Sequence, residues 1–356
     1  MENLVNPGFW LGKRVLLTGH TGFKGGWLGL WLHQLGARVT GFALPPPTTP
    51  SLFEVAHIGE MLDSVIGDIR DGAAVDAVFA RSNPQIVFHL AAQPLVSEGY
   101  EDPVGTYATN VMGTLNILQA ARRAPELQAM VVITTDKCYE NGESLHPYVE
   151  TDPLGGHDPY SSSKACTDIA VSSWRRSFFD LPDQAGLATA RAGNVIGGGD
   201  WAKNRLVPDL LRAFAAGEAA QLRHIQAVRP WQHVLEPLAG YLQLAEKLSA
   251  DKSFATAWNF GPATEDCVSV QQVADQLCAL WPGEARYLTE PSSLPHEAGL
   301  LLLNARRAQQ LLQWRPRWRL AEALRHTADW QLAWLNGSSM QDFCRQQINL
   351  YQQTAA

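Results

Sequence analysis

The sequence predicts an α/β fold, a doubly wound parallel sheet with a smaller C-terminal lobe. Between residues 13 and 200, short apolar runs alternate with segments of helical pattern. This is typical of parallel strands whose sheet is covered by helices on both faces. After about residue 198 the alternation becomes less regular. We therefore expect residues 1–198 to form mainly the sheet domain and residues 199–356 mainly the second lobe, with some chain crossing between them.

The predicted elements follow one another along the first half of the chain. Five short apolar runs are the expected strands, at residues 15–18, 39–44, 86–90, 130–135 and 187–192. Four helices are expected among them, at residues 25–36, 71–82, 104–124 and 160–180. The Asn83-Pro84 pair separates a helix from the next strand. The proline-rich segment 44–51 should be a surface loop, and segment 141–159 a loop beside the functional site.

Composition excludes several classes of protein. The chain has 356 residues, 46% of them hydrophobic, which is ample for a core. A net charge of −7 gives no basic surplus that would suggest nucleic acid or an anionic membrane as a partner. No secretory signal is visible, and no apolar run reaches the roughly 18 residues of a membrane helix. Five cysteines without CxxC spacing predict reduced thiols in a cytoplasmic protein and no metal site.

The first predicted strand runs into the segment GHTGFKG at residues 19–25. Gly19 allows a tight turn, Gly22 lets the backbone approach a pyrophosphate, and Gly25 lets the helix pack close to the sheet. The start of that helix then faces the phosphates. A glycine-rich turn without a ligand is the alternative, but the strand before it and the helix after it favour a dinucleotide site. That site comprises Gly19, Thr21, Gly22, Phe23, Lys24 and Gly25.

Two later segments are expected at the same dinucleotide. Asp68 can accept a hydrogen bond from an adenine amino group, although an exposed turn aspartate is the alternative. The small side chains of Ala91 and Ala92 let the backbone lie close to a cofactor. No acid and no arginine ends the second strand, so a 2′-phosphate has no obvious partner, and we favour NAD. The cofactor set is completed by Asp68, Ile69, Leu90, Ala91 and Ala92, together with Tyr160 and Lys164.

Tyr160 and Lys164 lie four residues apart on a predicted helix, so they share a face. A free tyrosine ionises at about pH 10. A neighbouring ammonium and a positive nicotinamide are expected to lower that pKa, so that Tyr160 can take the proton of an alcohol. Thr135, at the end of a strand, can bind the same hydroxyl. A chance YxxxK pattern is the alternative, which Thr135 and the glycine segment disfavour.

The triplet Thr135-Asp136-Lys137 adds a second acid, Asp136, and a candidate second base, Lys137. Oxidation of an alcohol needs only Thr135, Tyr160 and Lys164. Elimination of water needs a further acid and base. The sequence therefore predicts a dehydratase that uses NAD without consuming it.

These motifs resemble the extended short-chain dehydrogenase/reductase family over nearly the whole chain. Particular stretches narrow the resemblance to the CDP-glucose branch of its sugar-nucleotide 4,6-dehydratases, namely residues 134–141, 155–166, 188–202, 228–241 and 260–262. The resemblance implies a Rossmann-type domain, NAD as cofactor and CDP-D-glucose as the substrate bound by the C-terminal lobe. It also implies a homo-oligomer, dimer or tetramer, joined through the helices at 104–124 and 160–180. Its product would serve deoxysugar biosynthesis, as in O-antigen.

The same resemblance implies individual roles. Thr135, Tyr160 and Lys164 match the oxidation residues, and Asp136 and Lys137 match the elimination pair. The wider sugar-nucleotide 4,6-dehydratases carry Asp-Glu where this chain has Asp-Lys. A lysine can accept a proton only in its neutral form, so Lys137 can be the base only when it is neutral. The alternative is that Lys137 orients hydroxyls while Tyr160 or a water takes the proton. Substrate contacts are implied for Gln93, Asn194, Arg205, Arg229 and His233.

Two other functions remain open at this point. A nucleotide-sugar 4-epimerase would share Tyr160 and Lys164 but would need no elimination pair, so Asp136-Lys137 disfavours it. A NAD-binding regulatory protein without catalysis is disfavoured by the intact oxidation residues.

Overall fold

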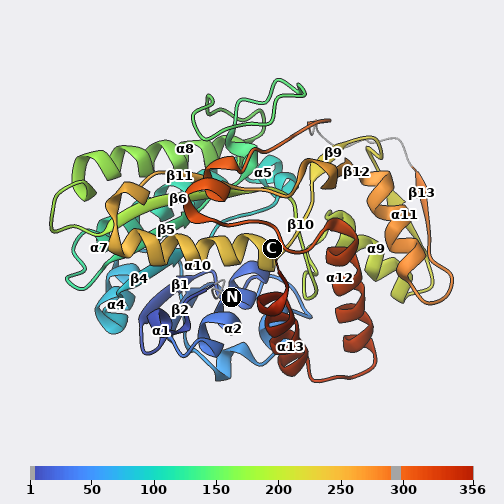
Figure 1. The fold of residues 1–356 in the computed structure, drawn as a ribbon, viewed down its shortest axis with the longest axis horizontal. Helices are drawn as coiled ribbons and strands as arrows, with labels where there is room; N and C mark the ends of the chain where they lie inside the picture. The colour runs from blue at the N-terminus through green and yellow to red at the C-terminus, as the bar shows by residue number, and fades with distance from the viewer. Residues whose placement is uncertain (1–4, 290–297, 356) are drawn as a thin grey trace.

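The computed structural model describes residues 5–289 and 298–355. Its centre is a sheet of seven parallel strands in the order β11-β6-β5-β4-β1-β2-β3 (Figure 1). From β1 the chain builds outward to β3, then crosses back and builds outward through β4 to β6, which is doubly wound topology. The strands are β1 (Arg14–Thr18), β2 (Arg38–Ala43), β3 (Asp63–Ile66), β4 (Ile86–His89), β5 (Ala129–Ile133), β6 (Gly186–Ala192) and β11 (Ala257–Phe260).

The predicted fold is confirmed, and all five predicted strands lie in this sheet. Two of its strands were not predicted, β3 and β11. Strand β3 has only half-buried or exposed residues, so it carries no apolar run. Strand β11 pairs with β6 from Ala257 beside Thr189 to Phe260 beside Ala192, which brings part of the C-terminal half into the large sheet. The division of the chain near residue 198 stays a prediction.

The helices cover both faces of the sheet, and alternate residues of β5 show how. Val131 and Ile133 face one core with α2 (Phe23–Gln34) and α10 (Leu235–Ala250). Met130 and Val132 face the other core, whose helices are α4 (Gly72–Ser82), α7 (Thr114–Ala121) and α8 (Pro159–Trp174). Because both faces are covered, the central strands β4 and β5 are buried at every residue rather than alternating.

The predicted helix at 104–124 is three consecutive segments: α6 (Pro103–Tyr107), a π-helical segment η2 (Ala108–Gly113), and α7. The break has a visible cause in the carbonyl of Asn110, which accepts hydrogen bonds from the hydroxyls of Thr114 at 2.6 Å and Thr167 at 2.9 Å. Side chains that bond a helix carbonyl locally disturb the backbone ladder. The predicted helix at 160–180 likewise ends in a π-helical segment, η4 (Arg175–Phe179).

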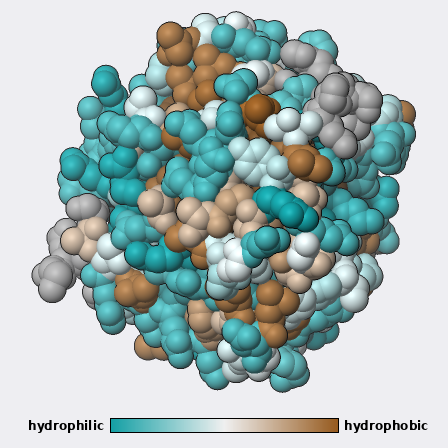
Figure 2. Space-filling view, turned by 90° about the vertical axis from the view of Figure 1, so that its right-hand side faces the viewer, coloured by the Kyte–Doolittle hydropathy of each residue, from teal (hydrophilic) through white to brown (hydrophobic). Residues whose placement is uncertain are grey.

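A second lobe lies beside the C-terminal ends of the strands (Figure 1). Its core joins helices α9 (Leu206–Ala215), α11 (Val270–Leu280) and α12 (Leu320–Leu335). Figure 2 shows its outer face, where hydrophobic side chains form small scattered groups among hydrophilic ones. Three strand pairs accompany these helices: β7 (Val195–Ile196) with β10 (Gln232–His233), β9 (Val228–Pro230) with β12 (Cys267–Ser269), and β8 (Ala219–Leu222) with β13 (Arg286–Thr289).

The C-terminal helix α13 (Met340–Gln353) returns to the sheet domain, where Tyr351 packs edge-on against Trp31 of α2 at 5.8 Å. Within the described residues, no helix has the length and apolar character needed to cross a membrane. The remaining short helices are α1 (Pro7–Trp10), α3 (Leu52–Val55), η1 (Ile58–Glu60), α5 (Val96–Glu101), η3 (Asp136–Cys138), η5 (Lys252–Phe254), η6 (Thr264–Asp266) and η7 (Ala308–Leu312).

Candidate active site

The predicted catalytic residues meet where β5 ends beside the start of α8. Thr135 follows β5 and caps η3, because its hydroxyl accepts a hydrogen bond from the backbone N–H of Lys137 at 3.3 Å. Tyr160, in the first turn of α8, lies near enough to Thr135 for that residue to lower the pKa of the phenol. One turn further, the Nζ atom of Lys164 donates to the carbonyl of Ile133 at 3.0 Å. The strand end and the helix are therefore bonded to each other directly.

The electrostatics of Tyr160 differ from the expectation. Burial raises the pKa of Tyr160 to about 12, while the hydrogen bond with Thr135 and the charge of Arg205 act to lower it. We predicted a lowered pKa with Lys164 as a neighbouring cation. Instead the ammonium of Lys164 is bound to a strand carbonyl, and burial lowers the pKa of Lys164 to about 8. Loss of water from the two side chains outweighs the charges around them.

Asp136 is a buried acid with one oxygen available. Its side chain is 2% exposed, and Oδ1 accepts a hydrogen bond from the Thr135 hydroxyl at 3.1 Å. Oδ2 has no hydrogen-bond partner among the described residues. Burial raises the pKa of Asp136, whereas the charge of Lys137, the Thr135 hydrogen bond and the charge of Arg229 lower it. A carboxyl that holds its proton more tightly than usual suits a general acid.

The glycine segment forms a close crossing of three backbones. Gly19 has a φ of +80°, and a Cβ on it would lie 2.8 Å from the backbone nitrogen of Ala91. A Cβ on Gly25 would lie 2.0 Å from the carbonyl oxygen of Gly19. Gly22 is the N-cap of α2 and brings no side chain to its first N–H groups, which stay open to a phosphate. These contacts fit the dinucleotide that the sequence predicts.

Lys24, which is expected to bind the cofactor, also interacts electrostatically with the catalytic residues. Burial lowers the pKa of Lys24 to about 8, and the charges of Arg205 and Lys164 lower it as well, whereas Asp136 raises it. Arg205, the N-cap of α9, is paired with Asp200 through Nη1 and Oδ2 at 2.8 Å. Lys24 and Arg205 therefore place two cations beside the oxidation and elimination residues.

Thr18 and His89 shape the cofactor crevice, and the sequence analysis gave them no role. The Thr18 hydroxyl accepts hydrogen bonds from the N–H groups of Leu90 and Ala91, both at 3.1 Å. It therefore donates to Nδ1 of His89 at 2.7 Å, while Nε2 of His89 meets the Thr114 hydroxyl at 2.9 Å. The Thr114 hydroxyl donates to a carbonyl, so Nε2 carries the proton of a neutral ring. The sequence signal that could have identified this role is His89 itself, a histidine at the end of a buried strand.

The segment after β4 is joined to α8 through Asn110. Its Nδ2 atom donates to the Ser163 hydroxyl at 2.8 Å and to the Gln93 carbonyl at 3.1 Å, and its Oδ1 accepts from the Gln93 N–H at 2.8 Å. The side-chain amide of Gln93 is itself bound to Thr106 at 2.9 Å. The substrate contact expected of Gln93 stays a prediction.

The other predicted ligand contacts also stay predictions, and the structure gives their surroundings. Arg229 is 5% exposed, donates to the carbonyls of Val228 and Ala298, and acts on the pKa of Asp136. The backbone carbonyl of Asn194 accepts a hydrogen bond from the backbone N–H of Gln232 at 3.0 Å.

His233 and Asp68 are occupied by neighbours of their own. The ring of His233 is fully buried, 4.8 Å from Trp318, and burial holds its pKa well below the usual value. Its Nε2 atom has no hydrogen-bond partner among the described residues, and the substrate contact expected of His233 stays a prediction. Asp68 receives two side-chain hydrogen bonds from Arg70, at 2.8 and 2.6 Å.

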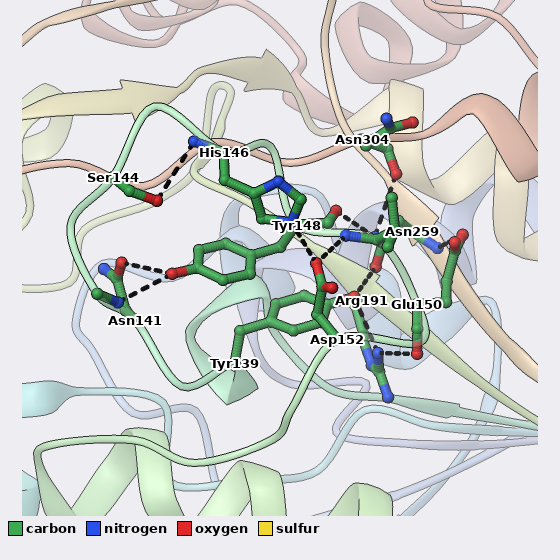
Figure 3. Close-up of polar contacts among 12 residues, drawn as sticks. Tyr139, Asn141, Ser144, His146, Tyr148, Glu150, Asp152, Arg191, Asn259 and Asn304 are labelled. Carbon is green, nitrogen blue, oxygen red and sulfur yellow. Dashed lines mark hydrogen bonds and ion pairs between the residues drawn. The ribbon is translucent and has the colours of Figure 1, made fainter.

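The expected loop at 141–159 is held by a polar network, shown in Figure 3. Tyr139, just before it, stacks on Tyr148 at 5.0 Å. The Tyr139 hydroxyl accepts from Nη1 of Arg191 at 2.8 Å and donates to Oδ1 of Asn259 at 2.7 Å. Asn141 donates to the carbonyl of Leu300 at 3.0 Å. The loop is therefore anchored to β6, to β11 and to the segment after residue 298.

Comparisons with known proteins agree with this geometry. The profile of the GDP-mannose 4,6 dehydratase family matches residues 16–327. A CDP-glucose 4,6-dehydratase of Salmonella typhimurium is 46% identical over 353 residues, covering 98% of this chain and 98% of the relative. A solved dTDP-glucose 4,6-dehydratase of Streptomyces venezuelae, with NAD bound, has a TM-score of 0.78 at 20% identity, covering 91% of this chain and 98% of that one. A Thermus thermophilus UDP-glucose 4-epimerase, in complex with NAD, has a TM-score of 0.78 at 23% identity, covering 90% of this chain and 99% of that one. The two structures support the fold and not a substrate.

Proposed function

This chain belongs to the GDP-mannose 4,6-dehydratase family, within the extended short-chain dehydrogenases/reductases, and from that premise we propose that it converts CDP-D-glucose to CDP-4-keto-6-deoxy-D-glucose with loss of water. One observation carries the proposal. The Thr135 hydroxyl donates a hydrogen bond to Asp136, a buried acid with an available oxygen, and Thr135 lies near enough to Tyr160, an oxidation residue, to act on its pKa. Oxidation and elimination can therefore act on one sugar at one place.

The chemistry that bound NAD supplies is reversible hydride transfer, from C4 of the sugar at the start and back to C6 at the end. Thr135 and Tyr160 bind the C4 hydroxyl, and Tyr160 takes its proton as the C4–H bond breaks. The resulting ketone acidifies the proton on C5. A base removes that proton while Asp136 protonates the departing C6 hydroxyl, which leaves as water. C5 takes back a proton from the base as hydride is returned to C6, so the net change is the loss of one water.

We propose Lys137 as the first candidate for the base that removes the C5 proton. Its ammonium lies close enough to Asp136 to act on the pKa of that carboxyl, so an acid and a base are available to neighbouring carbons of one sugar. The alternative is that Lys137 orients hydroxyls while Tyr160 or a water takes the proton.

For the nucleotide, we propose that Arg205 and Arg229 bind the diphosphate, because guanidinium groups match phosphate oxygens. Gln93, Asn194 and His233 complete the proposed substrate set. Asp68 and Ile69, after β3, are proposed at the adenine of NAD, and Leu90, Ala91 and Ala92 beside the glycine turn.

We also propose that the protein assembles as a homo-oligomer through α6, η2 and α8. These segments expose Val104, Met112 and Ile169, at 78%, 56% and 55%. Exposed apolar side chains on neighbouring helices are suited to bury against a second copy. A cytoplasmic location and a place in deoxysugar biosynthesis, such as that of O-antigen, complete the proposal. The five cysteines are all free thiols, as expected in a reducing compartment.

The deciding experiment is incubation of the purified protein with CDP-glucose and NAD, followed by analysis of the sugar product. We expect a 4-keto-6-deoxy product with no net accumulation of reduced cofactor. UDP-glucose and dTDP-glucose serve as matched controls and should turn over more slowly. A 4-epimer would establish the epimerase instead, and absence of turnover would reject both enzymes.

A further inference from the structure

Three consecutive residues where β5 ends each contact a different residue on one face of α8. The carbonyl of Ile133 accepts from Lys164 at 3.0 Å, and Thr135 lies near enough to Tyr160 to act on its pKa. Between them, the Thr134 hydroxyl donates to Oδ2 of Asp168 at 2.8 Å. The helix partners are spaced four residues apart, at 160, 164 and 168, so they form one stripe. In the order of the strand residues, the proposed reaction uses the first contact, with Lys164, and the last, with Tyr160. It leaves the middle contact, between Thr134 and Asp168, without a role.

The middle contact is held rigidly from a third element. Arg191 of β6 grips the Asp168 carboxylate with two hydrogen bonds of 3.0 Å, from Nε to Oδ2 and from Nη2 to Oδ1. Both residues are 3% exposed. Burial alone would raise the pKa of Asp168, but Arg191 and its hydrogen bonds bring it below the usual value, so the group stays ionised. A bidentate pair of this kind restricts both partners to a single geometry.

The same arginine also reaches the far side of the catalytic turn. Its Nη1 atom donates to the Tyr139 hydroxyl at 2.8 Å and to the Glu150 carbonyl at 3.2 Å. Tyr139 directly follows η3, which contains Asp136. Figure 3 shows Arg191 between Tyr139 and Glu150. Arg191 therefore contacts Tyr139 after the turn and, through Asp168, Thr134 before it.

We propose that Thr134 and Asp168, supported by Arg191, are positioning residues that hold Thr135 and Asp136 in register with Tyr160. The inference rests on the proposed function, because it takes these three side chains as the reacting groups. The expected effect is large for a contact that touches no substrate, since a displacement of about 1 Å at reacting groups can cost roughly 10²-fold in rate.

A purely structural role for the contact predicts something different, namely loss of stability without a selective loss of turnover. Thr134→Val keeps the shape of the side chain and removes its hydroxyl, while Asp168 keeps both hydrogen bonds from Arg191. Thr327→Val is the matched control, because the Thr327 hydroxyl is equally buried but donates to the Ala323 carbonyl within α12. Thr134→Ser retains the hydroxyl and tests for rescue.

The first measurement is kcat and KM for CDP-glucose with each variant. We expect Thr134→Val to lower kcat by about tenfold or more with KM within about twofold of wild type, because the lost register affects reacting groups rather than binding. Thr134→Ser should recover most of kcat, and Thr327→Val should retain it. If Thr134→Val and Thr327→Val lose kcat equally, or neither loses it, the positioning role is rejected.

The second measurement needs no turnover, so it separates failure of this inference from failure of the proposed function. The Lys137 N–H is bonded to Thr135 and the Cys138 N–H to the Thr135 carbonyl. Hydrogen exchange in a peptide covering 136–139 should quicken in Thr134→Val, with exchange in α12 unchanged. Exchange at the wild-type rate would overturn the inference whatever the substrate. Inactive wild-type protein with faster exchange in the variant would reject only the function.

Discussion

The carboxyl group of Asp136 lies directly against the backbone of Gly193. A Cβ atom on that glycine would stand 2.9 Å from Oδ2 of Asp136 and 2.6 Å from Cγ of Pro230, both closer than side-chain carbons approach other atoms. Gly193 follows β6, and Pro230 ends β9 in the second lobe. The acid is therefore buried in a slot between the two lobes that exists because one wall lacks a side chain.

Gly193→Ala should close this slot. The added methyl must displace Asp136 or Pro230, so we expect product formation to fall by at least about tenfold, as for other misplaced general acids. Reduced cofactor should still form on mixing with CDP-glucose, because Tyr160 is unchanged. Gly142→Ala is the matched control, since a Cβ there meets nothing within 4 Å. Equal turnover of the two variants would show that the slot does not position the acid.

Asp136→Asn should separate the two halves of the reaction. An amide keeps the shape of the side chain but cannot deliver a proton, so oxidation at C4 should survive while loss of water slows by roughly 10²–10⁴-fold. The measurement is rapid mixing with CDP-glucose, following absorbance of the reduced cofactor and release of product. Unimpaired elimination would move the acid role elsewhere, and His157 would be the first residue to replace.

Tyr160→Phe should abolish oxidation while leaving NAD affinity near that of wild type. The ring remains, but the group that takes the C4 proton is gone, which typically costs about 10²–10⁴-fold. Steady-state turnover and a binding titration with NAD measure the two effects. Tyr287→Phe removes a hydroxyl bonded to Asp275 in the second lobe and serves as control. Retention of more than about a tenth of wild-type turnover would contradict the role.

Lys137→Met should stop exchange of solvent deuterium into C5 of the 4-keto sugar while reduced cofactor still forms. Methionine has similar length and no base. Lys137→Arg is the informative control, because arginine keeps the positive charge but does not lose its proton in proteins. If exchange fails in both variants, the base role holds. Exchange at the wild-type rate in Lys137→Met would end it, and rescue by arginine alone would indicate an orienting role.

The ring of His89 should make stability depend on pH. Burial lowers the pKa of His89 from 6.5 to about 3, so the folded chain binds this proton less readily than the unfolded chain does. Its stabilising contribution is therefore complete above about pH 6.5 and is lost as pH falls through the folded-state value. We expect the free energy of unfolding, measured with urea, to decline less steeply between about pH 7.5 and 5 in His89→Gln than in wild type.

Glutamine can reproduce the neutral geometry at this position, accepting from Thr18 and donating to Thr114 without titrating. Replacement of His33, which is half-buried in α2, provides the control for removal of a histidine. A slope in His89→Gln equal to that of wild type would show that the protonation of His89 does not contribute to stability in this range.

Local pattern was sufficient for five of the seven strands of the large sheet and for proposing the glycine turn and the catalytic set. Apolar runs report burial on both faces of a sheet, and a spacing of four residues places Tyr160 and Lys164 on one helix face before any tertiary contact is known. The break at Asn110 was beyond that reach, because it depends partly on the hydroxyl of Thr167, which is 57 residues away in the chain.

By itself, then, the sequence determined the fold class and predicted the dinucleotide turn and the residues proposed to carry the chemistry, because each of these depends on neighbours close in the chain. Only the tertiary structure decided how those residues behave. Burial reversed the expected direction of the Tyr160 pKa, and Gly193 and Pro230 enclosed the acid. Asp168 accepts hydrogen bonds from Thr134, which is 34 residues earlier in the chain, and from Arg191, which is 23 residues later. Desolvation and register depend on which distant segments meet, and no local pattern records that.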